Sequence, residues 1–234
     1  RRIAAVVMVL FLGAYAAAQI SAGGKALEGV LDIDPRLGAI AVAGMIIAYS
    51  IAGGIRASIW TDAVQSISML VALIILCVVA FADKGGIGGA FASMMPLDDG
   101  RYMNLWPEQG ELVGTGGLAI VFFVLGWLFA GFSVVGQPHI MVRFMALDDE
   151  KNMQRTRFWY YSFFVLFYIL AAGLGLLSRL FLPELGDTEL ALPRMALQLL
   201  PDVFVGLILA GIFAATMSTA DSVVLSCSAA ITHD

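Results

Sequence analysis

Six long apolar stretches that carry no charged residue are the feature that most limits what this chain can fold into. A helix that crosses a lipid bilayer needs about 20 consecutive, mostly apolar residues. The stretches that meet this length are residues 3–21, 37–55, 63–82, 114–135, 158–178 and 203–220. The last one continues to about Thr232, since only Asp221 interrupts it. The sequence therefore predicts an all-α integral membrane protein with six transmembrane helices.

The composition excludes several other classes of protein. Hydrophobic residues make up 60% of the 234 residues and charged residues 13%, whereas soluble domains have about 45–50% and about 25%. A soluble globule of this size cannot bury so much apolar surface. The net charge of −5 gives no basic surface for nucleic acid. Both cysteines, Cys77 and Cys227, lie in apolar stretches, where a free thiol behaves as a small hydrophobic group.

Charged residues divide the connecting segments into two alternating sets. One set is short and holds seven positive residues, which are Arg1, Arg2, Arg56, Arg143, Lys151, Arg155 and Arg157. The other set, residues 22–36, 83–113 and 179–202, is longer and holds six positive residues and twelve acidic ones. Cytoplasmic segments of membrane proteins carry an excess of Lys and Arg. We therefore expect a multi-pass protein of the cell inner (plasma) membrane that begins and ends on the cytoplasmic side.

Hydroxyl groups gather on one face of the last apolar stretch. Ala215, Ser218, Thr219 and Ser222 fall at i, i+3, i+4 and i+7 and so share a helix face. Such a face offers the hard oxygen ligands that suit an alkali cation. The same hydroxyls can instead donate to carbonyls of their own helix or form a small-residue contact with another helix, and the spacing leaves these alternatives open. Asp221, an acid inside an apolar helix, needs a partner, water or an ion.

The fourth stretch is expected to break at Gly136, Gln137 and Pro138. Pro138 lacks a backbone N–H group and disfavours helical backbone at the preceding residue. Broken helices at membrane depth line cavities in transporters and hold their binding sites. The alternative is a helix that simply ends at Val135.

Three further polar residues lie in or beside apolar stretches. Tyr15 and Gln19, at i and i+4, form one polar face among alanines, which would either line a pore or join two helices. Asp62 begins the third stretch, where an acid also serves as a helix cap or first-turn charge.

Four groups of short strings occur in order along essentially all 234 residues. They are Tyr15 with Ala22-Gly23-Gly24-Lys25, Gly53-Gly54-Ile55-Arg56-Ala57 with Trp60-Thr61-Asp62, Gly136-Gln137-Pro138-His139 with Arg143-Phe144-Met145-Ala146, and Ala215-Thr216-Met217-Ser218-Thr219 with residues 228–232. Together they resemble the sodium:solute symporter family, and within it the sodium/proline symporter branch. The resemblance implies a LeuT-type inverted-repeat fold, of which residues 1–234 are a single transmembrane domain that lacks the first two core helices and the C-terminal helices.

The resemblance also implies an activity and a cation site. The activity is sodium-coupled import of a small polar solute, such as L-proline or a related amino acid, with sodium as the coupling ion, no other cofactor and no enzymatic reaction. The implied sodium ligands are the Ala215 carbonyl and the hydroxyls of Ser218 and Thr219. A second sodium is implied at Asp62, Asp221 and Ser222.

The resemblance carries over less fully to the solute site. Tyr15 matches a tyrosine that lines the proline site, and Gln19 and Trp127 are further candidates. Trp127 lies nine residues before Gly136, further than in the proline carriers, and the position of the next aromatic residue of that pattern reads Val134. Either the chain has an insertion or the pocket differs, so another small solute is an alternative to proline.

Two other functions compete with transport. The same fold occurs as a membrane sensor fused to a signalling kinase, which a kinase region in the same gene would favour. An intramembrane enzyme is the weaker hypothesis, because the sequence has neither a His-Glu-x-x-His zinc motif nor a Gly-x-Ser-x-Gly nucleophile motif.

Overall fold

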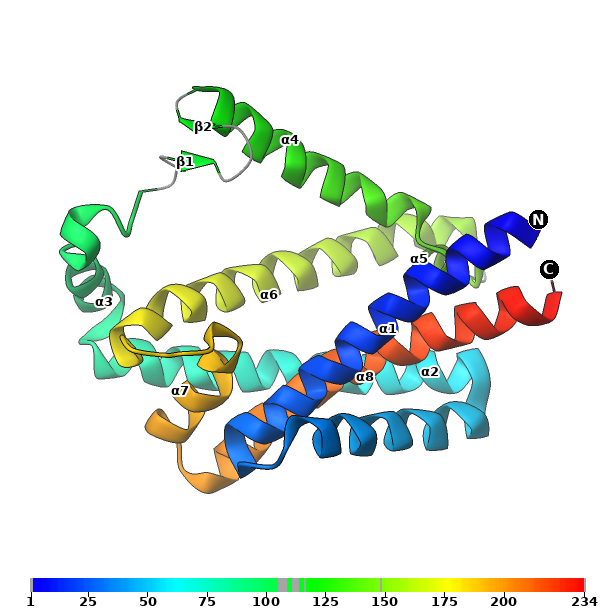
Figure 1. Ribbon diagram of the computed structural model, residues 1–234, viewed down its shortest axis with the longest axis horizontal. Coiled ribbons are helices and arrows are strands. Elements are labelled where there is room, and N and C mark those ends of the chain that lie inside the picture. The colour runs from blue at the N-terminus through cyan, green and yellow to red at the C-terminus, as the bar shows by residue number, and fades with distance from the viewer. Residues whose placement is uncertain (1, 105–108, 111–113, 116, 148, 234) are drawn as a thin grey trace.

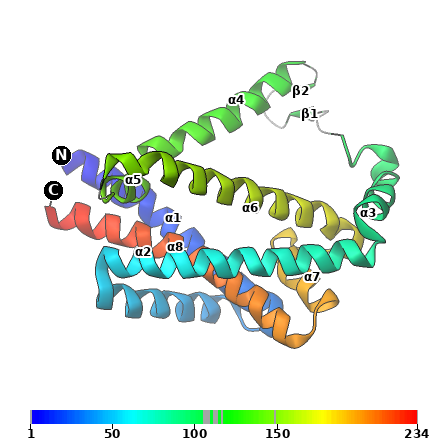
Figure 2. The same cartoon turned by 180° about the vertical axis from the view of Figure 1, so that it is seen from behind.

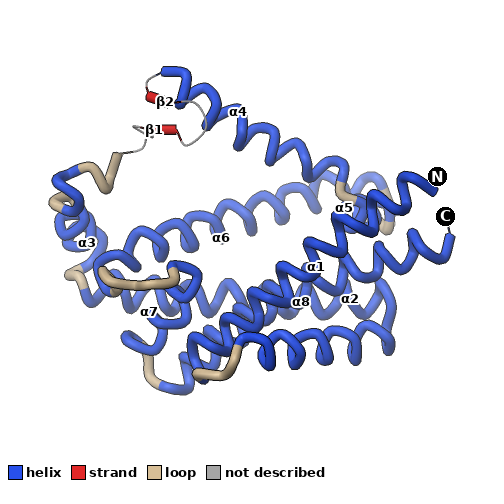
Figure 3. Tube along the Cα trace, in the orientation of Figure 1, coloured by secondary structure: helices blue, strands red, loops and turns tan. Residues whose placement is uncertain are grey.

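A computed structural model describes residues 2–104, 109–110, 114–115, 117–147 and 149–233, with side chains described outside 49–55, 57, 109–110, 114–115 and 233. The α-helices are α1 (Arg2–Leu31), α2 (Pro35–Asp83), α3 (Gly86–Met94), α4 (Gly117–Ser133), α5 (Pro138–Met145), α6 (Met153–Phe181), α7 (Ala191–Leu199) and α8 (Asp202–His233). Short 3-10 helices are η1 (Leu97–Gly100), η2 (Val134–Gly136), η3 (Glu150–Asn152) and η4 (Thr188–Leu190). Strands β1 (Gln109–Gly110) and β2 (Gly114–Thr115) pair antiparallel, and the rest of the described secondary structure is helical (Figure 3).

Long apolar helices dominate this architecture, which is consistent with the predicted all-α integral membrane protein. Within the described residues, five segments are long and apolar enough to cross a bilayer: Arg2–Leu31, Ser58–Asp83, Gly117–Gly136, Glu150–Phe181 and Asp202–Thr232. The stretch predicted at 37–55 falls in the first part of α2, where the described apolar segment is Pro35–Ala48 and the side chains of residues 49–55 lie outside the described ones. Five helices of spanning length are therefore found among the described residues, and the sixth stays a prediction.

The end of the first helix differs from the sequence prediction. Residues 22–36 were expected to form a loop, but α1 continues through Leu31. Gly23, Gly24, Ala26 and Gly29 are all buried in this added part. Small residues let neighbouring helices approach closely, so packing continues the helix although Lys25 and Glu28 bring charge into it.

Helix α2 turns back on itself, so that its first and second parts run side by side in opposite directions (Figures 1 and 2). Pro35 begins the helix, and the Asp34 carboxylate caps it by accepting a hydrogen bond from the Arg36 N–H at 2.8 Å. After the helix ends, Gly85 and Gly86 take positive φ angles of 77° and 85°, which glycine adopts without steric cost. The chain thus leaves α2 in a tight turn and enters α3.

Helix α8 is the centre of the molecule, because it packs along both α1 and α2. Leu12 and Ala16 of α1 pack on Val223, and Val42 and Ile46 of α2 pack on Ala220. Helices α1 and α2 also meet at glycines: a Cβ atom on Gly24 would lie 2.5 Å from the Pro35 carbonyl oxygen. The three helices therefore form a tightly crossed core around α8.

The bundle has two distinct ends. The N-terminus, the C-terminus, the turn within α2 and helix α5 gather at one end, which we call the termini end (Figures 1 and 2). Helices α3 and α7 and the β1–β2 pair lie at the opposite end. A large apolar cluster fills the opposite end and joins α2, α3, α6, α7 and α8; its fully buried members include Leu76, Met94, Leu177, Met195 and Ala80.

Candidate functional site

The hydroxyl face of α8 is held by hydrogen bonds to its own backbone. The Ser218 and Thr219 hydroxyls both donate to the Ala215 carbonyl, each at 3.2 Å. The Ser222 hydroxyl donates to the Ser218 carbonyl at 2.6 Å. Each hydroxyl proton therefore points at the helix, and the oxygen lone pairs of these side chains face outward, where they can accept a hydrogen bond or coordinate a cation. All three of Ala215, Ser218 and Thr219 are half-buried.

Two acidic side chains lie at the same level between α2 and α8. Asp221 is 1% exposed, and it lies near enough to Asp62 of α2 for the two carboxylates to interact electrostatically. The Asp62 Oδ1 atom is buried and has no hydrogen-bond partner among the described residues, and the same is true of Gln65 Oε1, one turn further along α2. Burying two neighbouring carboxylates is costly unless positive charge compensates them, so this region favours a positive charge.

Arg143 of α5 supplies a positive charge at this point. Its Nη2 atom is bound both to Asp62 Oδ2 and to the Ser222 hydroxyl. The Asp62 side chain is 16% exposed and that of Arg143 is 36% exposed, so the ion pair is partly shielded from water. One guanidinium thus ties α5 to both α2 and α8.

The sequence pointed to Arg143 as an orienting charge and as part of a short family string, but not as a bridge between helices. Arg143 lies 81 residues from Asp62 and 79 from Ser222 along the chain. Its one local signal is its position four residues after His139, which places both side chains on one face of α5.

The fourth apolar stretch is interrupted at the residues named above. Helix α4 ends at Ser133, η2 runs to Gly136, and Gln137 has extended backbone (φ −83°, ψ 114°) before α5 begins at Pro138. The segment of spanning length ends at Gly136, and eight further helical residues follow as α5 at the termini end (Figure 1). This break separates α4, which contacts mainly η2, β1 and β2, from α5, which packs on α8.

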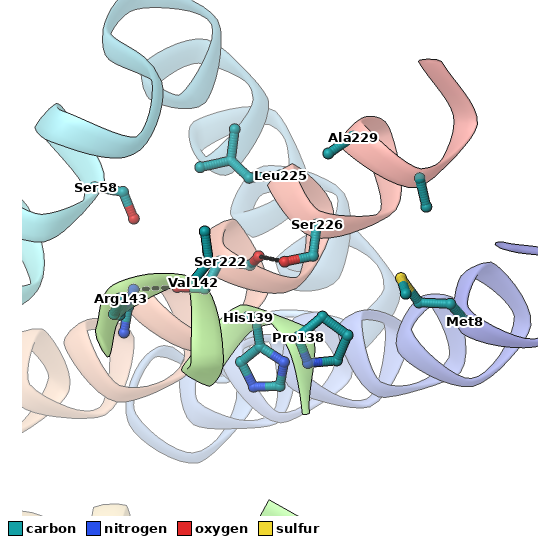
Figure 4. A pocket seen from close by; sticks show the side chains of 11 residues that line it. Met8, Ser58, Pro138, His139, Val142, Arg143, Ser222, Leu225, Ser226 and Ala229 are labelled. Carbon is teal, nitrogen blue, oxygen red and sulfur yellow. Dashed lines mark hydrogen bonds between the residues drawn. The ribbon is translucent and has the colours of Figure 1, made fainter. Parts of the chain in front are cut away.

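A cavity of about 450 Å³ opens beside the break (Figure 4). Its lining comes from α1, α2, α5 and α8 and includes Ser58, Pro138, His139, Arg143, Ser222 and Ser226. Arg143 and Ser222 therefore face a space large enough for water, ions or a small solute. Ser226, one turn beyond Ser222, donates to the Ser222 carbonyl at 2.9 Å.

The three predicted solute residues lie in different surroundings. Tyr15 is 39% exposed on α1, and its ring lies against the buried His139 ring, with centroids 6.1 Å apart. Gln19 is half-buried one turn further along α1. Trp127 is 69% exposed on α4 and stacks edge-on against Phe123 of its own helix at 6.4 Å. The described contacts thus bring Tyr15 to the broken helix but leave Trp127 on a separate surface.

A second charged cluster lies at the opposite end of the bundle. Lys25 of α1 forms an ion pair with Asp187 at 3.1 Å and a second one with Glu189 of η4. The Asp187 carboxylate also accepts a hydrogen bond from the Glu189 N–H at 3.0 Å. Lys25 and Glu189 line a cavity of about 560 Å³ together with Ala18, Ser21 and Pro193. This cluster links α1 to the segment between α6 and α7.

Comparison of the sequence with known proteins identifies its family. The sequence profile of the sodium:solute symporter family matches residues 1–234. The chain belongs to the sodium:solute symporter family. Family membership agrees with the resemblance that the four groups of short strings suggested.

Several curated relatives within the sodium:solute symporter family are proline transporters. The high-affinity proline transporter PutP of Bacillus subtilis is 30% identical over 238 residues, which cover 100% of this chain and 48% of the relative. The osmoregulated proline transporter OpuE of the same species is 27% identical, covering 99% of this chain and 46% of the relative. A sodium/proline symporter of Staphylococcus aureus is 31% identical, with 99% and 44% covered. This chain therefore spans somewhat less than half the length of these relatives.

Proposed function

We propose that this chain forms part of a sodium-coupled symporter that imports a small polar solute, with proline as the first solute to test. The observation that carries the proposal is the hydroxyl face of α8, where outward lone pairs lie beside buried carboxylates and a broken helix. The names of the relatives support sodium and proline as the ligands. On this proposal the protein is a transporter and not an enzyme, and sodium is its coupling ion.

The proposed sodium site consists of the Ala215 carbonyl and the Ser218 and Thr219 hydroxyls. The geometry supports the two hydroxyl oxygens, because each donates its proton within the helix and keeps lone pairs for an alkali cation. The Ala215 carbonyl accepts both of these protons in this structure, so its part in the site requires those hydrogen bonds to open. Sodium binding would favour a state with higher solute affinity, and thermodynamic linkage makes this coupling reciprocal. A LeuT-type inverted repeat, with its site at the midplane, is the architecture that we propose for the whole protein.

The proposed solute site uses Tyr15, Gln19 and Trp127 around the break at Gly136, Gln137 and Pro138. The Tyr15–His139 contact supports the part of this site formed by α1 and α5. For Trp127 to take part, α4 would have to turn its exposed aromatic face toward α1.

The proposed orientation places the termini end on the cytoplasmic side of the cell inner (plasma) membrane. Helix α5, the turn within α2 and both chain ends, which lie next to the positively charged segments, gather there (Figure 1). The acid-rich connections around α3 and α7 gather at the other end. This separation of charge supports the proposal through the positive-inside rule. Labelling single cysteines at positions 151 and 187 in sealed cells tests it, because only position 187 should react from outside.

Removing single hydroxyls tests the sodium site. In the full-length protein, Ser218→Ala and Thr219→Ala should each raise the sodium concentration for half-maximal uptake on the order of tenfold. A hydrogen bond to a charged group is worth roughly 1.5–3 kcal/mol, an ion–hydroxyl contact is taken as similar, and about 1.4 kcal/mol corresponds to a factor of ten. Solute affinity at saturating sodium should change much less.

Thr232→Ala is the matched control. Thr232 is exposed on the same helix and its hydroxyl likewise donates to a helix carbonyl, that of Ser228, at 2.9 Å. It should leave the sodium activation curve unchanged. Wild-type activation curves for both Ser218→Ala and Thr219→Ala would reject the sodium site.

A second sodium site at Asp62, Asp221 and Ser222 is proposed separately, from the buried carboxylates at the α2–α8 contact. Asp221→Asn distinguishes two roles for this acid. If Asp221 binds an ion, the Hill coefficient for sodium should fall toward one. If it only stabilises the fold, expression should fall while the remaining carrier keeps its sodium dependence.

A further inference from the structure

The same two oxygen atoms serve both a predicted ion and an observed side chain. Asp62 Oδ2 and the Ser222 hydroxyl oxygen, both assigned to the second sodium, converge on one atom, Nη2 of Arg143. Two oxygens from different helices that meet at one positively charged atom define a position suited to a cation. In this structure the guanidinium of Arg143 holds that position.

The orientation of Ser222 supports this interpretation. Its hydroxyl donates its only proton to the Ser218 carbonyl at 2.6 Å, so the oxygen presents a lone pair to Arg143. A sodium ion requires the same orientation. Ser222 therefore does not have to reorient to exchange one positive charge for the other.

Electrostatics makes the two occupants exclude each other. Both carry a full positive charge, and a position that contacts the same two oxygens cannot hold both in a partly shielded site where like charges repel strongly. When Arg143 leaves, Asp62 and the fully buried Asp221 remain as two neighbouring carboxylates. Their mutual repulsion then favours binding of a cation.

We infer that Arg143 is a built-in competitor of the second sodium ion: its guanidinium and the ion alternate at Asp62 and Ser222. This inference rests on the proposed sodium-coupled function. Because Arg143 belongs to α5, directly after the helix break, each exchange also changes whether α5 is tied to α2 and α8. Loss of the second ion thereby ties α5 to α2 and α8 beside the cavity, and binding of that ion releases α5.

The exchange makes a prediction opposite to that for an ordinary ligand. A ligand-binding state that is only partly populated weakens apparent affinity by the populated fraction. Arg143→Gln removes the competitor, so the sodium concentration for half-maximal uptake in the full-length protein should fall about tenfold. A purely structural role for Arg143 would lower the amount of protein or the maximal rate but would not improve sodium affinity.

Arg155→Gln is the matched control, because it removes one charge from an exposed arginine at the same end of the bundle. It should leave sodium activation unchanged. In an Asp62→Asn background, Arg143→Gln should no longer lower the half-maximal sodium concentration, because the shared ligand is gone. An unchanged or raised half-maximal concentration in Arg143→Gln, or an equal decrease in the Asp62→Asn background, would overturn the inference.

Arg143→Lys keeps the test decisive if the glutamine variant does not reach the membrane. Lysine retains the charge but has a single ammonium group in place of the guanidinium fork. It should therefore compete less well and lower the half-maximal sodium concentration by a few-fold, whereas no decrease would contradict the proposal. If wild-type uptake shows no sodium dependence at all, the proposed function fails, a result distinct from failure of this inference.

Discussion

Two clusters at opposite ends of the bundle use similar charges in different surroundings. At the termini end, Arg143 joins α5 to α2 through Asp62, which is 16% exposed, and to α8 through Ser222. At the opposite end, Lys25 joins α1 to η4 through Asp187 and Glu189, which are 43% and 66% exposed. Exposed ion pairs contribute little because water and salt screen them, whereas breaking a shielded pair leaves an uncompensated charge. The comparison teaches that the burial of an ion pair, and not the number of ion pairs, decides at which end of the bundle stability depends on charge.

The largest effect is expected from Arg143→Ala, which breaks the shielded pair. It should lower the free energy of unfolding by about 3 kcal/mol, at the low end of the range for a broken buried pair because Arg143 itself is partly exposed. Thermal unfolding of the purified protein in detergent measures this, with Arg155→Ala as the control of equal charge change. If the two variants melt together, the Arg143 bridge does not stabilise the fold.

The next effect is expected from Gly24→Ala, beside Lys25. A Cβ atom at this position would lie 2.5 Å from the Pro35 carbonyl oxygen and 2.8 Å from the Ala39 nitrogen, so the helices must separate. We expect a loss of about 2 kcal/mol, typical of overpacking. Gly13→Ala on the same helix has open space at its Cβ and should be neutral or slightly stabilising. Equal stability of the two variants would show that α1 and α2 do not cross this closely.

A smaller effect is expected from Lys25→Met, which removes both exposed ion pairs. The melting temperature should fall less than in Gly24→Ala, and the difference from wild type should shrink as salt is added, because exposed charges are screened. The same salt series on Arg143→Ala should change its melting difference much less. If salt changes the melting differences of Lys25→Met and Arg143→Ala equally, the two clusters do not differ in their shielding from water.

The smallest effect concerns pH at the Lys25 cluster. The Glu189 N–H, followed by the Lys25 ammonium, holds the pKa of Asp187 below its ordinary value of 3.8. A lowered pKa means that Asp187 contributes stability above that value and loses the contribution as pH falls through its pKa in the folded protein. Asp187→Asn should remove this part of the acid-induced loss, as measured by melting between pH 5 and about pH 2. A wild-type profile in the variant would assign the acid sensitivity to other groups.

The sequence was sufficient for features that depend on neighbouring residues. Stretches without charge predicted the apolar helices, the missing N–H group of Pro138 predicted the interruption after Gly136, and the i, i+3, i+4 spacing put Ser218 and Thr219 on one face. Each depends on local backbone chemistry or helical periodicity. These features therefore need no knowledge of how the helices pack.

Features that depend on packing were not predictable in this way. The continuation of α1 beyond Ser21 depends on contacts such as that of Gly24 with α2. The Arg143 bridge joins residues about 80 positions apart and needs the path of three helices. For the same reason, spacing could not show that Trp127 lies on an exposed face while Tyr15 meets His139.

The central place of α8 has a consequence for biosynthesis. Helices α1 and α2 emerge before α8, and about 120 residues separate the end of α2 from the start of α8. At roughly 5–20 residues per second, translation of that interval takes on the order of ten seconds. During this time Ala16 and Val42 do not yet have the α8 contacts that later cover them. The residues of α8 that complete the core and the residues that form the hydroxyl face lie on the same helix. Packing of α8 against α1 and α2 therefore completes the core and positions the hydroxyl face in one folding step.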